Sequence, residues 1–119
     1  MTRRLALLAS LFAAPLLAQS PAPEPQPLTL GQAAALKCSA AFARGAALQA
    51  RGEGSEWPPL AERGREFFVR TSARIMDETG RSRDFVALEL TRESQALAAP
   101  GTLAAAMGPC LLLLDASGL

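Results

Sequence analysis

The sequence predicts an all-α protein, a small bundle of four to five helices with one disulfide. Half of its residues are hydrophobic but only 5% are aromatic, so the apolar content is mainly Ala and Leu, which favours helices over strands. Apolar residues recur three and four positions apart through most of the chain, the spacing that gathers them on one side of a helix. Two cysteines, Cys38 and Cys110, supply the pair for the disulfide.

Residues 1–18 have the composition of a signal peptide. Arg3 and Arg4 precede an apolar stretch over residues 5–17, and Ala18 is the expected cleavage position. The paired arginines also resemble part of a twin-arginine signal, so the export route, general secretory or twin-arginine, stays open. The apolar stretch is too short for a lasting anchor, and we expect no membrane span after cleavage. The sequence therefore predicts a periplasmic or secreted protein.

Two segments follow the signal: a Pro-rich spacer over residues 19–28 and one helical domain over residues 29–119. Alternate prolines keep the spacer extended and leave it no apolar face to bury. The formal net charge of +1 falls by two when the signal arginines are removed, so the mature chain is nearly neutral. Such a balance gives no reason to expect nucleic acid as a partner.

Thr29 and Gln32 predict the start of the first helix, because their spacing fits a capping box. We expect a second helix to approach this one closely near Gly45, since a glycine inside a helix costs about 1 kcal/mol relative to Ala. The predicted contact is a seam of small or apolar residues, which is also a candidate surface for a homodimer. Its members are Ala34, Cys38, Ala41, Gly45 and Leu48.

The second and third helices are bounded by proline, glycine and serine. Trp57-Pro58-Pro59 should open the second helix, because proline fits a first helical turn. Glu66 and Arg70 should form an ion pair on its solvated side. Gly80 should end this helix and Ser82 should cap the next. The apolar face expected for the second helix consists of Leu60, Gly64, Phe67, Phe68, Ser72, Ile75 and Met76.

The last helix should begin at Leu103 and be disturbed by a glycine-proline pair. Thr102 is its expected cap, after the turn at Pro100-Gly101. Gly108-Pro109 should break or kink it, because proline removes a helical hydrogen bond. Residues 111–114, four consecutive leucines, are expected to form a buried terminal turn.

Cys38 and Cys110 are expected to form a structural disulfide. They lie far apart, with no C-x-x-C spacing, and an oxidising compartment favours a structural bond over a redox centre. A metal site on these thiolates would need two more ligands, and the chain has no histidine. We therefore expect no metal and no cofactor.

No motif specifies a reaction, so we expect no enzyme and no catalytic residue. The chain lacks histidine and tyrosine, which leaves Ser39 and Ser117 without a general base. Residues 52–55 lack the lysine of a phosphate-binding loop. The aromatic residues are interpreted as core filling rather than pocket lining: Trp57, Phe67, Phe68 and Phe85. The acidic residues alternate with arginines and are interpreted as a solvated face: Glu62, Glu66, Asp77, Glu78 and Asp84.

The order of these features resembles that of small uncharacterised exported helical proteins of alphaproteobacteria. The likeness lies in the signal, the spacer, the segment 37–42, the Glu66-Phe67-Phe68 helix and the terminal Met107-Gly108-Pro109-Cys110. It brings no activity with it. Size, compartment and one cysteine pair are also similar to those of periplasmic acid-stress chaperones of the HdeA type, by analogy and without a shared motif.

The leading hypothesis is a small helical binding or interaction protein of the periplasm, with an unknown protein partner or a second copy of itself. The alternative is an envelope stress chaperone of the HdeA type, which would hold unfolded proteins in acid. A chain without histidine would sense acid only through its carboxylates.

Export predicts a shorter mature protein. Because the basic, apolar and small-residue order is that of a cleaved signal, protein recovered from a periplasmic extract should begin at Gln19. Intact-mass spectrometry checks this start. A mass that retains Met1, or recovery only from the cytosol, would contradict both the cleavage and the compartment.

Overall fold

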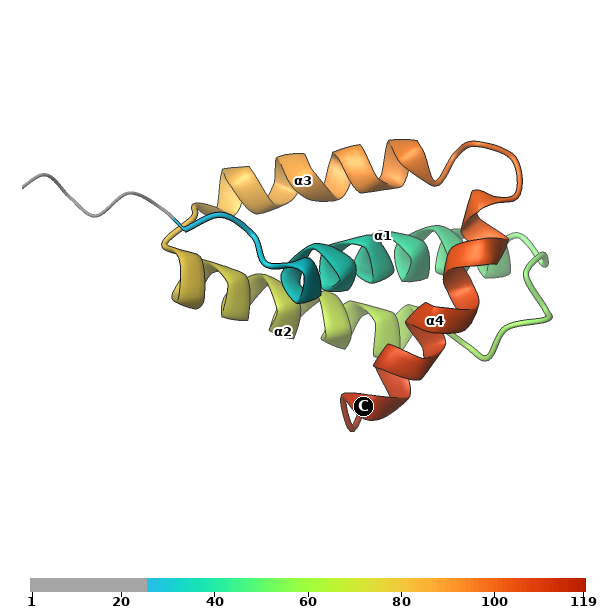
Figure 1. The fold of residues 1–119 in the computed structure, drawn as a ribbon. Coiled ribbons are helices and arrows are strands. Elements are labelled where there is room, and N and C mark those ends of the chain that lie inside the picture. Colours follow the sequence, from blue (N-terminus) through green and yellow to red (C-terminus); the bar gives the residue numbers. More distant parts are fainter. Residues whose placement is uncertain (1–25) are drawn as a thin grey trace, which may run out of the picture.

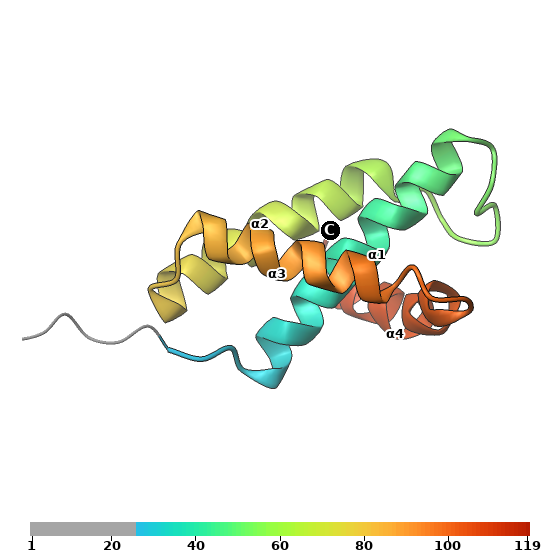
Figure 2. The same ribbon diagram turned by 90° about the horizontal axis from the view of Figure 1, so that it is seen from above.

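The computed structural model describes residues 26–119, and within them the chain forms four α-helices and no strand. They are α1 (Leu30–Ala50), α2 (Ala61–Thr79), α3 (Arg83–Ala96) and α4 (Thr102–Ala116). Figure 1 shows α1 between α2 and α3, with α4 running across them, and Figure 2 shows the same bundle from above. The all-α bundle is confirmed. The predicted signal peptide and the spacer up to residue 25 lie outside the described residues.

The predicted capping box at the start of α1 is confirmed. The Thr29 hydroxyl accepts the Gln32 backbone N–H at 3.1 Å, and the Gln32 side-chain oxygen accepts the Thr29 N–H at 2.9 Å. The Gln32 amide nitrogen also donates to the Glu78 carboxylate at 2.8 Å. One side chain therefore caps α1 and ties its start to the end of α2.

The middle of α1 is the centre of the core. Cys38, Ala41 and Gly45 are buried, which confirms the central part of the seam, while Ala34 at its start is exposed. The main cluster draws on α1, α2, α4 and the residue that follows α3, and it contains Cys38, Ala40, Ala41, Phe42, Leu60, Phe67, Leu97, Met107, Cys110 and Leu114. A second, smaller cluster joins α1, α2 and α3 through Leu36, Ile75 and Val86.

The closest contact between α1 and α2 lies at Gly64 rather than at Gly45. A Cβ added to Gly64 would lie 2.8 Å from the Phe42 Cβ, an atom fixed to the α1 backbone. The Phe42 ring meets Phe67 edge to face, with centroids 5.3 Å apart. A Cβ added to Gly45 would instead meet the tip of the Leu60 side chain at 2.5 Å and Met107 of α4 at 3.1 Å. Gly45 thus faces α4 and the approach to α2.

The prediction that Trp57-Pro58-Pro59 opens α2 is wrong, because the helix begins at Ala61. The segment before it is shaped by Gln49 of α1. The Gln49 amide oxygen accepts the Leu60 N–H at 3.0 Å. Its amide nitrogen donates to three carbonyls at 2.9 to 3.2 Å, those of Gly54, Trp57 and Pro58. The segment before α2 is thus fixed by hydrogen bonds from a residue of α1, and the prolines within it do not start the helix.

The expected boundary between α2 and α3 is confirmed at both residues. Gly80 ends α2 with φ of 70°, a left-handed conformation that suits glycine. The Ser82 hydroxyl accepts the Phe85 N–H at 3.1 Å and so caps α3. These local signals place the α2–α3 turn where the sequence predicts it.

Two expectations for α4 are wrong. Thr102 does not cap the helix, because its hydroxyl donates to the Ala99 carbonyl at 2.6 Å and Gly101 occupies the cap position. The helix also continues through Pro109, so the expected break is wrong, whereas the alternative of a kink stays a prediction. Proline leaves the carbonyl of Ala105 without its helical donor, but Ala105 is exposed to water. Gly108 has no Cβ, which removes part of the clash that disfavours helix before proline.

The expected burial of residues 111–114 is also wrong. Only Leu114 is fully buried, whereas Leu112 is 72% exposed and Leu113 is 38% exposed. Successive side chains in a helix point in different directions around its axis, and α4 packs on the bundle along one side only. A run of four leucines cannot all face that side.

The glycine contacts predict a graded loss of stability. Gly64→Ala should lower the free energy of unfolding by about 1 to 3 kcal/mol, because the new methyl meets the rigid Phe42 Cβ. Gly45→Ala should cost less, since the tip of Leu60 can move. Gly31→Ala is the control: its Cβ would meet nothing closer than 3.9 Å, so stability should stay level or rise. Thermal and urea denaturation measure all three, and a stabilised Gly64→Ala would contradict the close crossing.

Candidate functional site

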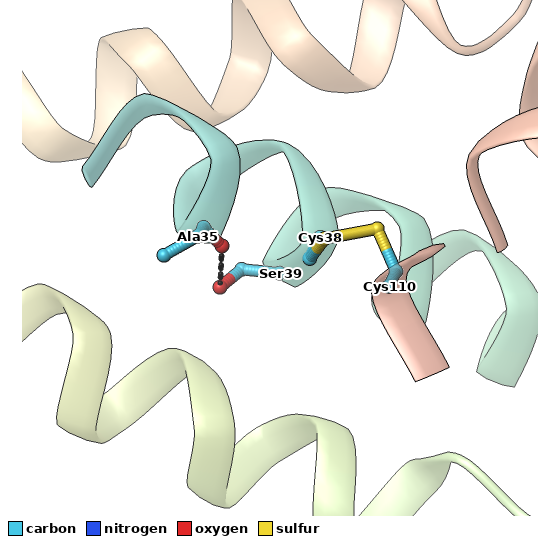
Figure 3. Close-up of a disulfide and its surroundings, with 4 residues drawn as sticks. All are labelled: Ala35, Cys38, Ser39 and Cys110. Atoms are coloured by element: carbon cyan, nitrogen blue, oxygen red, sulfur yellow. Dashed lines mark hydrogen bonds between the residues drawn. A yellow bond between two sulfur atoms is a disulfide. The ribbon is translucent and has the colours of Figure 1, made fainter. Parts of the chain in front are cut away.

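A covalent bond fixes α4 on α1. Cys38 and Cys110 form the predicted disulfide, with their Cα atoms 5.1 Å apart and both residues buried (Figure 3). Beside it the Ser39 hydroxyl donates to the Ala35 carbonyl at 2.8 Å, as Figure 3 also shows. The buried Ser39 hydroxyl is therefore satisfied within its own helix, and the disulfide region is structural.

Arg63 of α2 makes the second attachment of α4, which sequence reasoning missed. Its guanidinium donates to the Leu119 carbonyl oxygen from Nε at 3.0 Å and from Nη2 at 2.7 Å. Nη2 also donates to the Asp115 carboxylate at 2.8 Å. The partners are more than fifty positions from Arg63 in the chain, so no local pattern could reveal the contact.

The acidic residues do not gather into a site. Within residues 26–119 no three Cys, Asp or Glu side chains are grouped so as to hold a metal ion. The predicted Glu66–Arg70 ion pair is wrong, because the ion pairs formed within residues 26–119 are Arg51–Glu53, Arg63–Asp115 and Arg92–Glu89. A solvated pair contributes only a few tenths of a kcal/mol, too little to hold Arg70 against other conformations.

The aromatic side chains are spread over the bundle. Phe67 is buried in the main cluster and Trp57 is packed against it. Phe85 belongs to the second cluster, and the Arg81 guanidinium lies 4.5 Å from its ring centroid. The Ser117 hydroxyl donates to the Leu114 carbonyl at 2.5 Å. The aromatic side chains thus pack in separate clusters and do not form one pocket. Ser117 bonds to a carbonyl at the end of its own helix.

One exposed stripe of α4 carries no charge. We call it the α4 face and define it as Ala105, Gly108, Pro109 and Leu112, which recur at helical spacing and are all exposed. Asp115 is the only charged residue of this helix, and its carboxylate is bonded to Arg63. The sequence signal for this surface was the run of leucines in α4, because the core buries only part of that run.

A groove lies on another side of the bundle, where α2, the start of α1 and the end of α4 meet. We call it the α2 groove. Its volume is about 590 Å³, within the usual range for small-molecule sites. Phe67, Leu113 and Leu119 contribute apolar side chains, and Arg70 and Arg74 contribute guanidinium groups. No sequence motif indicated this groove, because three separate segments form it.

Among the helices of residues 26–119, none is long and apolar enough to cross a membrane. Comparisons with family models, with curated proteins and with solved structures find no match to this chain. The α4 face and the α2 groove are therefore the basis on which a function can be argued.

The disulfide predicts a redox-dependent fold. Closing a loop over a sequence separation of 72 should stabilise the native state by roughly 4 kcal/mol. Reductant or Cys110→Ser should therefore loosen α4 first and then lower the thermal midpoint of the whole bundle. Circular dichroism with and without reductant measures the loss.

Thiol titration of the denatured, unreduced protein is the control for that experiment and should find no free thiol. Two free thiols, or a melting curve indifferent to reductant, would show that the bundle does not depend on this bond.

Proposed function

We propose that this chain is an exported, disulfide-bonded helical binding protein of the periplasm, and that the α4 face docks an envelope protein. The observation that carries the proposal is the exposure of Leu112, 72%, at the C-terminal end of a stripe without charge. An apolar stripe of this kind is typical of surfaces that are covered by a partner. A face held rigidly on the bundle also loses little conformational freedom on binding.

Other exposed apolar residues do not form a comparable surface. Leu30 is 91% exposed at the first position of α1, and Val69 and Leu88 are half exposed on α2 and α3. Val69 lies one helical turn from Arg65, and Leu88 lies one turn from Asp84 and Arg92. Single exposed apolar residues beside charges are ordinary on protein surfaces. The α4 face is the stripe in which apolar residues follow one another without interruption.

The small-residue seam is a poor homodimer surface. Cys38, Ala41 and Gly45 are buried by the chain's own helices, and Gly45 faces Leu60 and Met107. A second copy of the chain would have to dock elsewhere. The α4 face is then the surface that self-association would use.

The disulfide supports the proposed compartment, because such bonds persist in oxidising environments such as the periplasm or the cell exterior. A second candidate function, an envelope stress chaperone of the HdeA type, would use the same exposed leucine to hold unfolded clients. Light scattering of a denaturing client at neutral and acidic pH separates the two, since only the chaperone suppresses aggregation.

Site-specific photocrosslinking tests the docking surface. A photoreactive residue at position 112 should crosslink the oxidised protein to one defined partner in the native envelope. The control is the same residue at position 88, which replaces a half-exposed leucine on α3. Crosslinks at both positions, or at neither, would contradict the assignment. A crosslink between two copies would identify the partner as the chain itself.

A further inference from the structure

Within residues 26–119, the arginines of the α2 groove form no ion pair. Arg70 and Arg74 line the groove one helical turn apart, and the ion pairs formed within residues 26–119 involve Arg51, Arg63 and Arg92 instead. Like charges at this spacing destabilise a helix slightly unless an anion lies between them. The groove therefore presents two guanidinium groups that form no ion pair within residues 26–119.

The end of the groove that lies away from Phe67 carries an acidic residue. Glu78 lies there, and its carboxylate accepts a hydrogen bond from the Gln32 amide at 2.8 Å. The carboxylate is thus engaged in tying α1 to α2. Thr71 adds a hydroxyl on the same side of α2 as the arginines. Along α2 the lining residues run from Phe67 to Glu78, a length of about 16 Å at the helical rise.

The floor and one end of the groove are apolar. Phe67 and Ile75 are almost wholly buried, and they lie at its base together with Ala35. Leu113 and Leu119 close the end next to α4. A ligand that fits this surface has an apolar chain for the Phe67–Leu113 end and a negative group for the arginines on the rim.

We infer that the α2 groove binds a single-chain amphiphile with a carboxylate head, such as a free fatty acid. The planar guanidinium groups of Arg70 and Arg74 match a carboxylate in geometry and charge. The apolar chain lies over Phe67 and against Leu113. This site is separate from the α4 face, so each assignment stands or fails without the other.

Calorimetric titration of the oxidised mature protein with dodecanoate, kept below its micelle concentration, tests this inference. Arg70→Gln combined with Arg74→Gln should weaken binding at least tenfold. The matched control, Arg65→Gln combined with Arg83→Gln, removes the same charge outside the groove and should leave the affinity unchanged. Leu113→Asn should also weaken binding, because it places an amide against the chain. Circular dichroism shows whether each variant is folded.

A neutral analogue separates charge from apolar contact. Dodecanol should bind to the unaltered protein at least tenfold more weakly than dodecanoate. The two ligands should bind with equal affinity to the Arg70/Arg74 variant. Equal binding of the two ligands to the unaltered protein would overturn the carboxylate assignment. Absence of dodecanoate binding, or binding only to vesicles that contain fatty acid, would overturn the site itself.

Discussion

The arrangement of the bundle depends on the small side chains in the middle of α1. Ala40, Ala41 and Gly45 are almost without side-chain volume, and each is buried. Large residues there would hold the neighbouring helices apart, whereas small ones let α2, α3 and α4 pack around a single helix. The bulk of the core comes from the partners and from Phe42, which fits over Gly64. Small residues on one helix and larger ones around it thus form one packed unit.

The position of α4 follows from two attachments at different points along it. The disulfide fixes Cys110 to α1, and Arg63 of α2 holds the segment that contains Asp115 and Leu119. The packed side of α4 is buried through Met107, Cys110 and Leu114. Because this attachment uses one side of a helix that is mainly apolar, the opposite side remains exposed and apolar. The α4 face is therefore a consequence of composition and orientation together.

Several local signals were predictable, although the start of α2 and the cap of α4 were not, and the long-range contacts could not be predicted. The capping box at Thr29, the stop at Gly80 and the cap at Ser82 depend on neighbours within a few positions, so the sequence was sufficient. The disulfide could be predicted because the chain has two cysteines. The contacts of Gln49 and Arg63 depend on how segments meet in space, and the same holds for the side of α4 that carries Leu112. The docking of α4 decides which leucines of residues 111–114 are buried. A stretch of four residues is too short for its periodicity to predict them.

The α2 groove exists only while the end of α4 is in place. Its base is made by α1 and α2, which are joined by Gln32 and Glu78, but Leu113 and Leu119 come from the far end of α4. Those residues are held by Arg63 at the surface and by a bond at Cys110 that needs an oxidising environment. Surface contacts of a guanidinium alone contribute little against the freedom of a detached helix. The apolar wall of the groove therefore depends on the disulfide, and a reduced chain would keep the arginines of α2 but lose the surface opposite them.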